Sequence, residues 1–440
     1  MSLVNASLRI ERLAYGPTGV GRVNAQNGQI EKVGKVVFVP NTVPGDHVDV
    51  VITQEKKRHA NGRVIALRRP SPERRNPPCP YVPRCGGCPW QQVTYPEQLR
   101  AKESLVRENM RRIGGMADPP VLPIIPSPQE WRYRHRIRLR TEPPARLGFY
   151  QAQSHELVEL ADCLIAGKNS ARHLARARDW LAQLHTLVRR VELVTSDPVC
   201  TSAEGVVLMG NAEGPFHMAD EEACAAFLRA HTDVSGLILF GRGWRRTWGE
   251  THVVLDLGVD GLTLVVKNGG FTQVNPAANR VLIKTLLQLG GFDGSQKVIE
   301  GYCGGGNLSL PIAAHSRELF GVEQDADAIA DARDNSARAG LQNVQFIHAS
   351  AQAGLQTLLR RKVQADVVVL DPPRAGAAEI LEVIPQLGAT KIVYASCDPT
   401  TLARDLRLLG QSGYRVDYLQ PIDLFPQTYH IETIAVAVLT

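Results

Sequence analysis

The chain has 440 residues, more than one domain usually holds, so two or three domains are expected. Apolar residues make up 44% of it, and the net charge of +6 suits a nucleic-acid partner without requiring one. No signal-peptide pattern and no apolar run of membrane-spanning length is found, so we expect a cytoplasmic protein without a membrane partner. Its eight cysteines then serve metal binding, catalysis or packing rather than disulfides.

Residues 8 to 75 alternate short β-branched runs with turns rich in Gly, Pro and Asn, as in GVGRV, GKVVFVP and DHVDVVIT. About five strands in roughly 60 residues predict a small OB-like β-barrel, assigned to residues 1–75. Basic residues gather near its end: Lys56, Lys57, Arg58, Arg63, Arg68, Arg69, Arg74 and Arg75. They are either a solvated face or contacts to the phosphate backbone of a nucleic acid.

Three cysteines follow in the Pro- and Gly-rich segment NPPCPYVPRCGGCPW, residues 76–90. Cys79, Cys85 and Cys88 form a C-x5-C-x2-C run, and Cys163 in LADCLIAG could supply a fourth thiolate. Such a set suits a closed tetrathiolate site, and the spacing alone does not separate zinc from an iron–sulfur cluster.

The middle of the chain is expected to be a small α+β domain around these cysteines, formed by residues 76–92 and 125–265. A helix over 95–115, ended by Gly114 and Gly115, would lie in a connector, residues 93–124. The segment WRYRHRIRLR (131–140) has arginine at every second position from Arg132 to Arg140. In a strand, that spacing would place all five arginines on one face.

From about residue 266 to residue 440, apolar runs that end in Gly, Pro or polar residues alternate with helical segments. This order predicts a C-terminal α/β domain with a Rossmann-like, doubly wound parallel sheet. Ligands of such sheets bind beyond the carboxyl ends of the strands. The run KIVYASCDP places Cys397 at one of these ends, where its thiol could attack a ligand.

A cofactor site is indicated by VIEGYCGGGN (298–307), a strand that runs into a Gly-rich turn. The next strand ends in Glu323, 19 residues beyond Gly304, and its carboxylate could accept hydrogen bonds from ribose hydroxyls. No phosphate-cradling motif accompanies it, which favours S-adenosylmethionine over NAD or ATP. Glu323 could instead be a surface carboxylate, and Cys303 inside the turn is expected to be a packing residue.

Six motifs in order make the catalytic half resemble the RNA uracil-5-methyltransferase family, in particular its iron–sulfur-containing 23S ribosomal RNA type. They are FTQVNP, CGGGNLSLPIA, GVEQDADAI, VLDPPRAG, YASCDPTTLARDL and DLFPQTYHIETIA. The first 70 or so residues resemble a TRAM domain, and CPYVPRCGGCPWQQVTYPEQLRAK resembles the family's cluster segment.

The resemblance implies a role for each matching residue. Cys397 would be the nucleophile and Glu432 the general base. The methyl donor or the target base would be contacted by Gln273, Tyr302, Asn307, Glu323 and Asp371. A [4Fe-4S] cluster would be held by Cys79, Cys85, Cys88 and Cys163. Ribosomal RNA would be the partner, with no obligate protein partner.

Uracil chemistry explains why these residue types are needed. Carbon 5 of uracil is a poor nucleophile. Addition of a thiolate to carbon 6 turns the ring into an enolate, and carbon 5 can then attack the donor's methyl group. A base must then remove the carbon 5 proton so that the cysteine can leave. Asp371 could bind the uracil edge, and the uridine must be unpaired or flipped out to reach such a pocket.

Three alternatives to a ribosomal RNA enzyme follow from the same sequence. The same reaction on transfer RNA uses the same catalytic motifs. An RNA-binding module with an inactive methyltransferase domain is disfavoured by the intact Cys397, Asp371 and Glu432. A radical methylthiotransferase would combine a TRAM-like domain and a cluster, but it requires a C-x3-C-x2-C run that is absent here.

Overall fold

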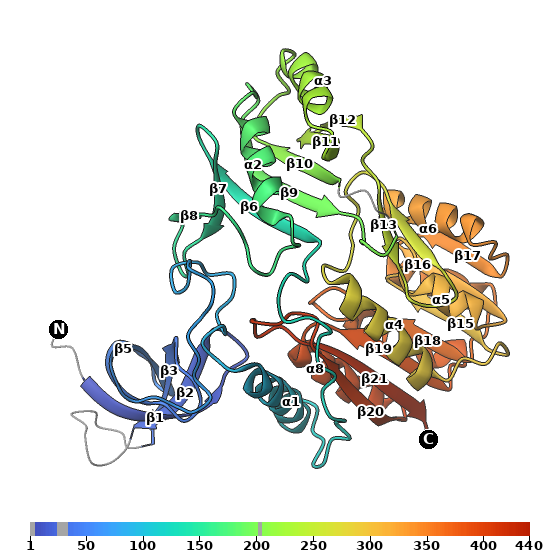
Figure 1. Cartoon of the computed structure of the whole chain (residues 1–440). Coiled ribbons are helices and arrows are strands. Elements are labelled where there is room, and N and C mark those ends of the chain that lie inside the picture. Colours follow the sequence, from blue (N-terminus) through green and yellow to red (C-terminus); the bar gives the residue numbers. More distant parts are fainter. Residues whose placement is uncertain (1–4, 24–33, 201–204) are drawn as a thin grey trace.

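The computed structural model describes residues 5–23, 34–200 and 205–440. The remaining residues, 1–4, 24–33 and 201–204, belong to the predicted barrel and central domain and lie outside the described residues. Along the chain, a small barrel is followed by a central sheet and then by a second sheet covered by helices (Figure 1). Within the described residues, no helix combines the length and the apolarity that a membrane crossing requires.

A closed five-stranded barrel opens the chain, as predicted, with the strand order β1-β2-β3-β5-β4. Its strands are β1 (Asn5–Leu13), β2 (Thr18–Val23), β3 (Val36–Pro40), β4 (His47–Glu55) and β5 (His59–Arg69). Alternate residues of β3 point inward, so that Val37 and Val39 are fully buried beside Ile10 and Val50. The barrel therefore has its own apolar core.

The predicted basic cluster divides into two kinds of residue. Lys56, Lys57 and Arg58 are exposed at the β4–β5 turn. In contrast, Arg74 lies 2.6 Å from the buried carboxylate of Asp46, so that its charge serves the barrel's own structure. Only part of the cluster is therefore available to a partner.

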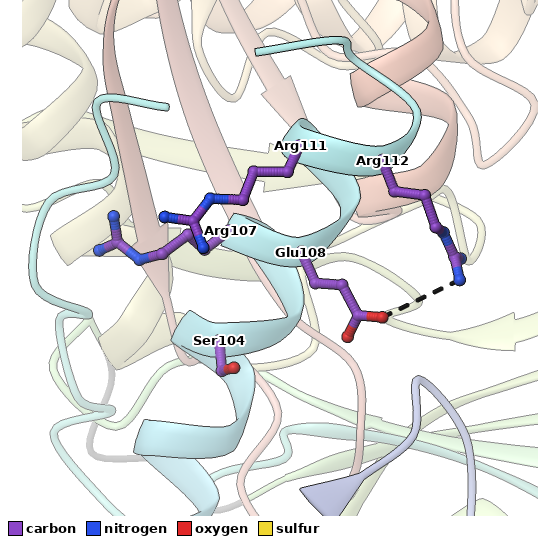
Figure 2. Close-up of a pocket in the computed structure, with 5 residues that line it drawn as sticks. All are labelled: Ser104, Arg107, Glu108, Arg111 and Arg112. Atoms are coloured by element: carbon purple, nitrogen blue, oxygen red, sulfur yellow. Dashed lines mark ion pairs between the residues drawn. The ribbon is translucent and has the colours of Figure 1, made fainter. Parts of the chain in front are cut away.

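Helix α1 (Tyr95–Arg112) joins the barrel to the rest of the molecule, and its cap at Ile113 precedes the two glycines that were expected to end it. It buries Val106 and Met110 against the C-terminal sheet's helical layer. Its outer side forms a hollow of about 300 Å³ (Figure 2), lined by Ser104, Arg107, Glu108, Arg111 and Arg112. Glu108 pairs there with Arg112 at 3.9 Å and with Arg12 of β1 at 3.3 Å, which fastens helix to barrel.

The central domain is built on a seven-stranded sheet with the order β12-β11-β10-β9-β6-β7-β8. Its strands are β6 (Arg136–Glu142), β7 (Arg146–Tyr150), β8 (Leu157–Glu159), β9 (Val188–Thr195), β10 (Val206–Ala212), β11 (Val234–Gly241) and β12 (Trp244–Gly249). Helices α2 (Ser170–Leu181) and α3 (Asp220–Ala230) cover one face, burying Trp180 and Phe227. A hairpin of β13 (Val253–Asp256) and β14 (Thr263–Val266) then leads into the last domain.

The expectation that five arginines share one strand face is wrong for the first two. Strand β6 begins only at Arg136. Arg132 has a φ of 58° and turns to Asp162, which its guanidinium contacts at 2.5 Å. Arg134 also precedes the strand, and its backbone pairs with Ile165 and Gly167. Tertiary contacts of the cysteine-bearing loops thus override the alternating pattern.

The C-terminal domain is the predicted doubly wound sheet, with the order β17-β16-β15-β18-β19-β21-β20. Its strands are β15 (Lys297–Gly301), β16 (Glu318–Glu323), β17 (Val344–His348), β18 (Val367–Leu370), β19 (Lys391–Ser396), β20 (Tyr414–Ile422) and β21 (Glu432–Leu439). The first five strands in this order are parallel, and β21 runs antiparallel to both of its neighbours. The sheet is therefore mixed rather than wholly parallel.

Helices cover both faces of this sheet. They are α4 (Pro276–Gly290), α5 (Ser309–Ala314), α6 (Ala326–Arg338), α7 (Ala351–Arg360) and α8 (Pro399–Gln411). Side chains of α1, α7 and α8 form one apolar core, and those of α4, α5 and the β13–β14 hairpin form the other. The barrel's connecting helix is thus an integral layer of the catalytic half.

A fully buried ion pair joins α1 to the loop between β20 and β21. The Lys102 ammonium lies 2.6 Å from the Asp423 carboxylate, and neither side chain is exposed to solvent. Burial lowers the pKa of Lys102, and the neighbouring carboxylate of Asp423 counteracts that shift. Lys102 also donates to the backbone oxygen of Phe425 at 3.1 Å, which fixes the direction of the loop.

We predict that Lys102→Met destabilises the protein by about 3–5 kcal/mol, because it leaves the Asp423 carboxylate buried without its partner. The double variant Lys102→Met/Asp423→Leu should recover much of that loss. Urea unfolding of the full chain measures both. Arg112→Ala, which removes an exposed arginine that pairs with Glu108 one turn earlier on the same helix, is the control and should change stability by about 0.5 kcal/mol or less.

Candidate active site

Strand register brings the predicted catalytic and cofactor residues to one edge of the C-terminal sheet. Gly301 is aligned with both Val322 and Leu370, so Tyr302, Glu323 and Asp371 follow three neighbouring strands at the same level. Ser396 is aligned with Thr433, which places Cys397 beside Glu432. Residues that are more than 100 positions apart in the sequence thus meet along one row of strand ends.

Cys397 lies in the short turn between β19 and α8. The carboxylate of the following residue, Asp398, caps α8 by accepting hydrogen bonds from the amides of Thr400 and Thr401 at 2.8 and 3.2 Å. The Tyr15 hydroxyl, from the β1–β2 turn of the barrel, donates to the backbone oxygen of Cys397 at 3.3 Å. The barrel and the catalytic sheet therefore hold the thiol between them.

The surroundings of the Cys397 thiol raise its pKa. Burial raises the pKa of Cys397 to about 11, and the nearby carboxylates of Glu432 and Asp371 raise it as well, whereas the guanidinium of Arg374 lowers it. Arg374 also lies 3.2 Å from Nδ1 of His430. Burial, together with Arg374, lowers the pKa of His430 to about 4, so this imidazole is neutral at physiological pH.

Two carboxyl groups beside the thiol hold protons more tightly than usual. Glu432 is only 3% exposed, and burial together with the charge of Asp371 raises its pKa well above the ordinary value. Burial also raises the pKa of Asp371. Glu300, nearby and 1% exposed, accepts a hydrogen bond from the Ser309 hydroxyl at 2.5 Å, and burial raises its pKa to about 8. Burial in this site therefore raises the pKa of all three carboxyl groups.

The Gly-rich turn and Glu323 meet as the sequence pattern predicted they could. The amide of Gly304, at a φ of 53°, donates to one carboxylate oxygen of Glu323 at 3.2 Å. The other oxygen accepts hydrogen bonds from the amides of Gln324 and Asp325 at 2.7 and 2.9 Å. These contacts fix the carboxylate in the position from which a ribose could bind it.

The other three candidate cofactor-binding residues differ in whether their side chains already form hydrogen bonds within the protein. The amide of Asn307 exchanges two hydrogen bonds with Asn279 of α4, at 2.7 and 3.0 Å. The Tyr302 hydroxyl donates to Glu379 at 2.7 Å. Gln273 bonds through its backbone oxygen, which is 3.0 Å from Nε2 of His135, and its side-chain amide has no hydrogen-bond partner within the described residues.

The four candidate metal-binding cysteines line one small pocket of about 70 Å³ in the central domain. Burial raises the pKa of Cys85 to about 11 and that of Cys88 to about 12. The pocket also holds two polar atoms that lack a hydrogen-bond partner among the described residues, Oε1 of Gln91 and Nε of Arg134. A site lined by thiols and unpaired polar atoms is suited to an inorganic ligand rather than to simple packing.

The spacing of these thiols is wide. Across the described ranges, the only three or more His, Cys, Asp or Glu ligand atoms within 4.8 Å of one another are those of His185, His217 and Asp220. No three of the four thiols are therefore that close. Thiolates on a single tetrahedral zinc ion, at a Zn–S distance of about 2.3 Å, stand only about 3.8 Å apart.

Sequence reasoning missed two residues of the site. Arg374 stands in the DPPR motif beside Asp371, and this basic neighbour was the signal that could have identified it. Tyr15 lies 382 positions from Cys397, and no sequence signal links the two. Its ring packs edge-on against Tyr429, with 5.6 Å between the centroids, so it also contacts the loop before β21.

Known proteins resemble this chain over nearly its whole length. A tRNA (Uracil-5-)-methyltransferase family profile matches residues 233–438, and a TRAM domain profile matches residues 7–65. An uncharacterized RNA methyltransferase of Gloeobacter violaceus is 33% identical over 97% of this chain and 94% of its own. A relative with the same description from Halalkalibacterium halodurans is 32% identical, covering 97% and 95% of the two chains.

Among solved structures, the tRNA (uracil-54, C5)-methyltransferase of Pyrococcus abyssi, crystallised with S-adenosyl-L-homocysteine, has the same fold. Its TM-score is 0.71 at 22% identity, with 98% of this chain and 99% of that chain covered. Fold and relatives thus define the class of the protein as an RNA methyltransferase. More narrowly, the chain belongs to the RNA uracil-5-methyltransferase family, with an N-terminal TRAM domain.

The raised pKa of Cys397 leads to a prediction about its reactivity. Alkylation of this thiol by iodoacetamide should be slow at pH 7 and accelerate about tenfold per pH unit up to pH 10, because only the thiolate reacts. Arg374→Ala should slow it further, since loss of the positive charge raises the thiol pKa. Mass spectrometry of the Cys397 peptide measures the rate.

The matched control is Arg415→Ala, which removes an exposed arginine of β20 paired with Asp417 and should leave the rate unchanged. Fast alkylation at pH 7 that does not depend on pH would contradict the raised pKa of the Cys397 thiol.

Proposed function

We propose that this enzyme transfers a methyl group from S-adenosyl-L-methionine to carbon 5 of a specific uridine in 23S ribosomal RNA. The observation that carries the proposal is the pairing of Cys397 with Glu432 on adjacent strand ends, in register through Ser396 and Thr433. A nucleophile and a base beside one another are what addition at carbon 6 and proton removal at carbon 5 require.

In the proposed reaction, the Cys397 thiol loses its proton and adds to carbon 6 of the flipped uracil. The thiol proton is proposed to pass to the Asp371 carboxylate, whose charge raises the thiol pKa, so that the Glu432 carboxylate stays free to take the carbon 5 proton. Arg374 stabilises the thiolate because its charge lowers the thiol pKa. S-adenosyl-L-methionine, bound beside Glu323 and the Gly-rich turn, supplies the methyl group that carbon 5 takes.

Glu432 then accepts the carbon 5 proton, and the bond between Cys397 and carbon 6 breaks to restore the aromatic ring. The burial that raises the pKa of Glu432 makes it a stronger base than an ordinary carboxylate. Asp371 is proposed to bind the uracil edge, and Gln273 to contact the donor or the base. Tyr302 and Asn307 are proposed to complete the donor pocket from the Gly-rich side.

The cysteine pocket is proposed to hold a [4Fe-4S] cluster on Cys79, Cys85, Cys88 and Cys163. The fit rests on four buried or half-buried thiols that line one pocket, no three of which have their sulfur atoms within 4.8 Å of one another, and on the unpaired polar atoms of Gln91 and Arg134 in the same lining. Methyl transfer is polar and needs no electron, so the role of the cluster is structural or RNA-shaping. Tyr133, next to Arg134, donates its hydroxyl to the backbone oxygen of Pro426 at 3.0 Å, linking the pocket to the catalytic loop.

A second candidate substrate is transfer RNA. The whole-chain likeness to the P. abyssi enzyme, which acts on position 54 of transfer RNA, favours it. The barrel combined with a cysteine cluster favours ribosomal RNA, because the simpler bacterial transfer-RNA enzymes resemble only the catalytic domain. Presenting both RNAs to the same enzyme distinguishes the two candidate substrates.

With radiolabelled methyl donor, the wild-type enzyme should label an unmodified 23S ribosomal RNA transcript and not transfer RNA transcripts. Cys397→Ala should bind RNA yet transfer no label. Glu432→Gln should be about 10²- to 10⁴-fold slower in turnover and should accumulate a labelled RNA–protein adduct, because methyl transfer precedes the step that needs the base. Denaturing electrophoresis detects that adduct.

Labelling of transfer RNA alone would replace the ribosomal substrate by the second candidate. A slow Glu432→Gln enzyme with no labelled adduct at any time would assign Glu432 to positioning the uracil instead of to proton removal.

Anaerobically purified protein should contain about four iron and four acid-labile sulfide ions per chain. Cys163→Ser should lower both contents sharply, because it removes one of the four proposed ligands. Cys224→Ser is the control, since Cys224 is equally buried but lies against Trp180, away from the pocket. Stoichiometric zinc without labile sulfide would contradict the cluster.

A further inference from the structure

The face of the central sheet that α2 and α3 leave uncovered carries one continuous row of polar and aromatic side chains. The register aligns Arg140 of β6 with Arg190 of β9, Arg190 with Asn211 of β10, Asn211 with Phe240 of β11, and Phe240 with Arg245 of β12. Aligned residues in neighbouring strands lie on the same face. The row therefore crosses five strands, and at about 4.8 Å per strand it spans roughly 19 Å.

The arginines of this row are not committed to carboxylates. Arg140 is exposed and stacks over Tyr150 at 5.2 Å, and neither Arg140 nor Arg190 has an ion pair among the described residues. Arg190 donates to the side-chain oxygen of Asn211 at 3.1 Å. Arg245 stacks over Phe240 at 5.7 Å, and its one pair, with Asp327 at 3.6 Å, is solvent-exposed and so contributes little.

The neighbouring row of aligned residues, Arg138, Glu192 and Met209, lies nearer the active site and forms a hollow together with the row of Arg190. About 200 Å³ of space is lined by Arg138, Arg190, Glu192, Met209, Asn211 and Phe240. Glu192 is engaged by Arg136 and Arg138, so this acidic residue is neutralised within the sheet. The face is therefore positive overall, with aromatic rings at both ends of the row.

The same face leads directly to the catalytic domain. Arg136, two residues before Arg138 and on the same face of β6, donates to the backbone oxygens of Gly270 and Gly269 at 2.6 and 3.1 Å. A side chain at Gly269 would fall within 1.9 Å of Met209, so this segment lies flat on the sheet. Four residues after Gly269 the chain reaches Gln273, which the proposed function places beside the donor or the target base.

We propose that this row, Arg140, Arg190, Asn211, Phe240 and Arg245, binds the single-stranded RNA segment that flanks the target uridine. The inference rests on the proposed function, since it takes RNA as the substrate. The guanidinium groups would pair with phosphates. Bases would stack on the rings of Tyr150 and Phe240 and on the planes of the guanidinium groups. A single strand suits the row because its unstacked bases can stack on the rings, whereas the bases of a duplex are stacked on one another.

The test compares two double variants that remove the same charge. Arg190→Ala/Arg245→Ala removes two arginines of the row, and Arg229→Ala/Arg246→Ala removes two exposed arginines on the side of the sheet that α2 and α3 cover. Arg246 is aligned with the buried Leu239 and lies over the Phe216 ring, and Arg229 is a residue of α3 that pairs with Glu222. The full chain is titrated with a fluorescein-labelled single-stranded 12-nucleotide oligouridylate and with a duplex RNA of the same length.

The row variant should bind the single strand about 5- to 10-fold more weakly at low salt, and the slope of log K against log salt should fall by about 1.4, or 0.7 per lost phosphate contact. The opposite-face variant should match the wild type in both quantities. Arg190→Lys/Arg245→Lys should restore most of the salt slope but not the full affinity, because lysine keeps the charge and loses the planar stacking.

Equal effects in the two alanine variants, or none in the row variant, would overturn the proposal, as would an equal loss for duplex RNA. Thermal unfolding of each variant identifies a folding defect. If the alanine variant of the row is misfolded, the binding of the Arg190→Lys/Arg245→Lys variant is compared with that of the wild type instead. Methyl transfer is measured in parallel, with KM raised and kcat retained in the row variant. Wild-type protein that transfers no methyl group to any RNA would refute the proposed function, whereas the face-dependent binding difference tests the row by itself.

Discussion

The buried ion pair between Lys102 and Asp423 is the constraint on which the active site depends. It joins the helix that follows the barrel to the loop that precedes Glu432, and its cost of desolvation is offset only when both partners are in place. The same loop receives the Tyr133 hydroxyl at Pro426 and the ring of Tyr15 at Tyr429. Barrel, central domain and catalytic sheet thus all contact the loop that positions the base.

The chemistry of the site follows from this enclosure. A thiol and two carboxyl groups share a poorly solvated space, which raises the pKa of each, and Arg374 is the positive charge that favours the thiolate. Entry of a flipped uridine would bring the electrophile and exclude water in the same step, which ties activation of Cys397 to correct binding of the substrate.

The arginines of the protein fall into two groups, those paired with carboxylates inside the structure and those without such a partner on its surface. Arginines that hold the structure together are paired and partly buried, as Arg74 is with Asp46 and Arg132 with Asp162. Arg140 and Arg190, on one face of the central sheet, have no carboxylate partner among the residues that the structure describes, and the Arg140 guanidinium lies over the Tyr150 ring. A net charge of +6 therefore understates how positive the surface beside the catalytic domain is.

Local patterns in the sequence determined the barrel, the doubly wound sheet and the strand-end position of Cys397, because alternation, turn residues and apolar runs act over a few neighbouring residues. The motifs also placed Glu323 opposite the Gly-rich turn. Only the tertiary structure decided that β21 runs antiparallel, that Arg132 leaves the expected strand, and that Tyr15 reaches the backbone of Cys397. Those features depend on contacts between segments up to 382 residues apart, and hydrophobic periodicity carries no information about which distant segments will meet.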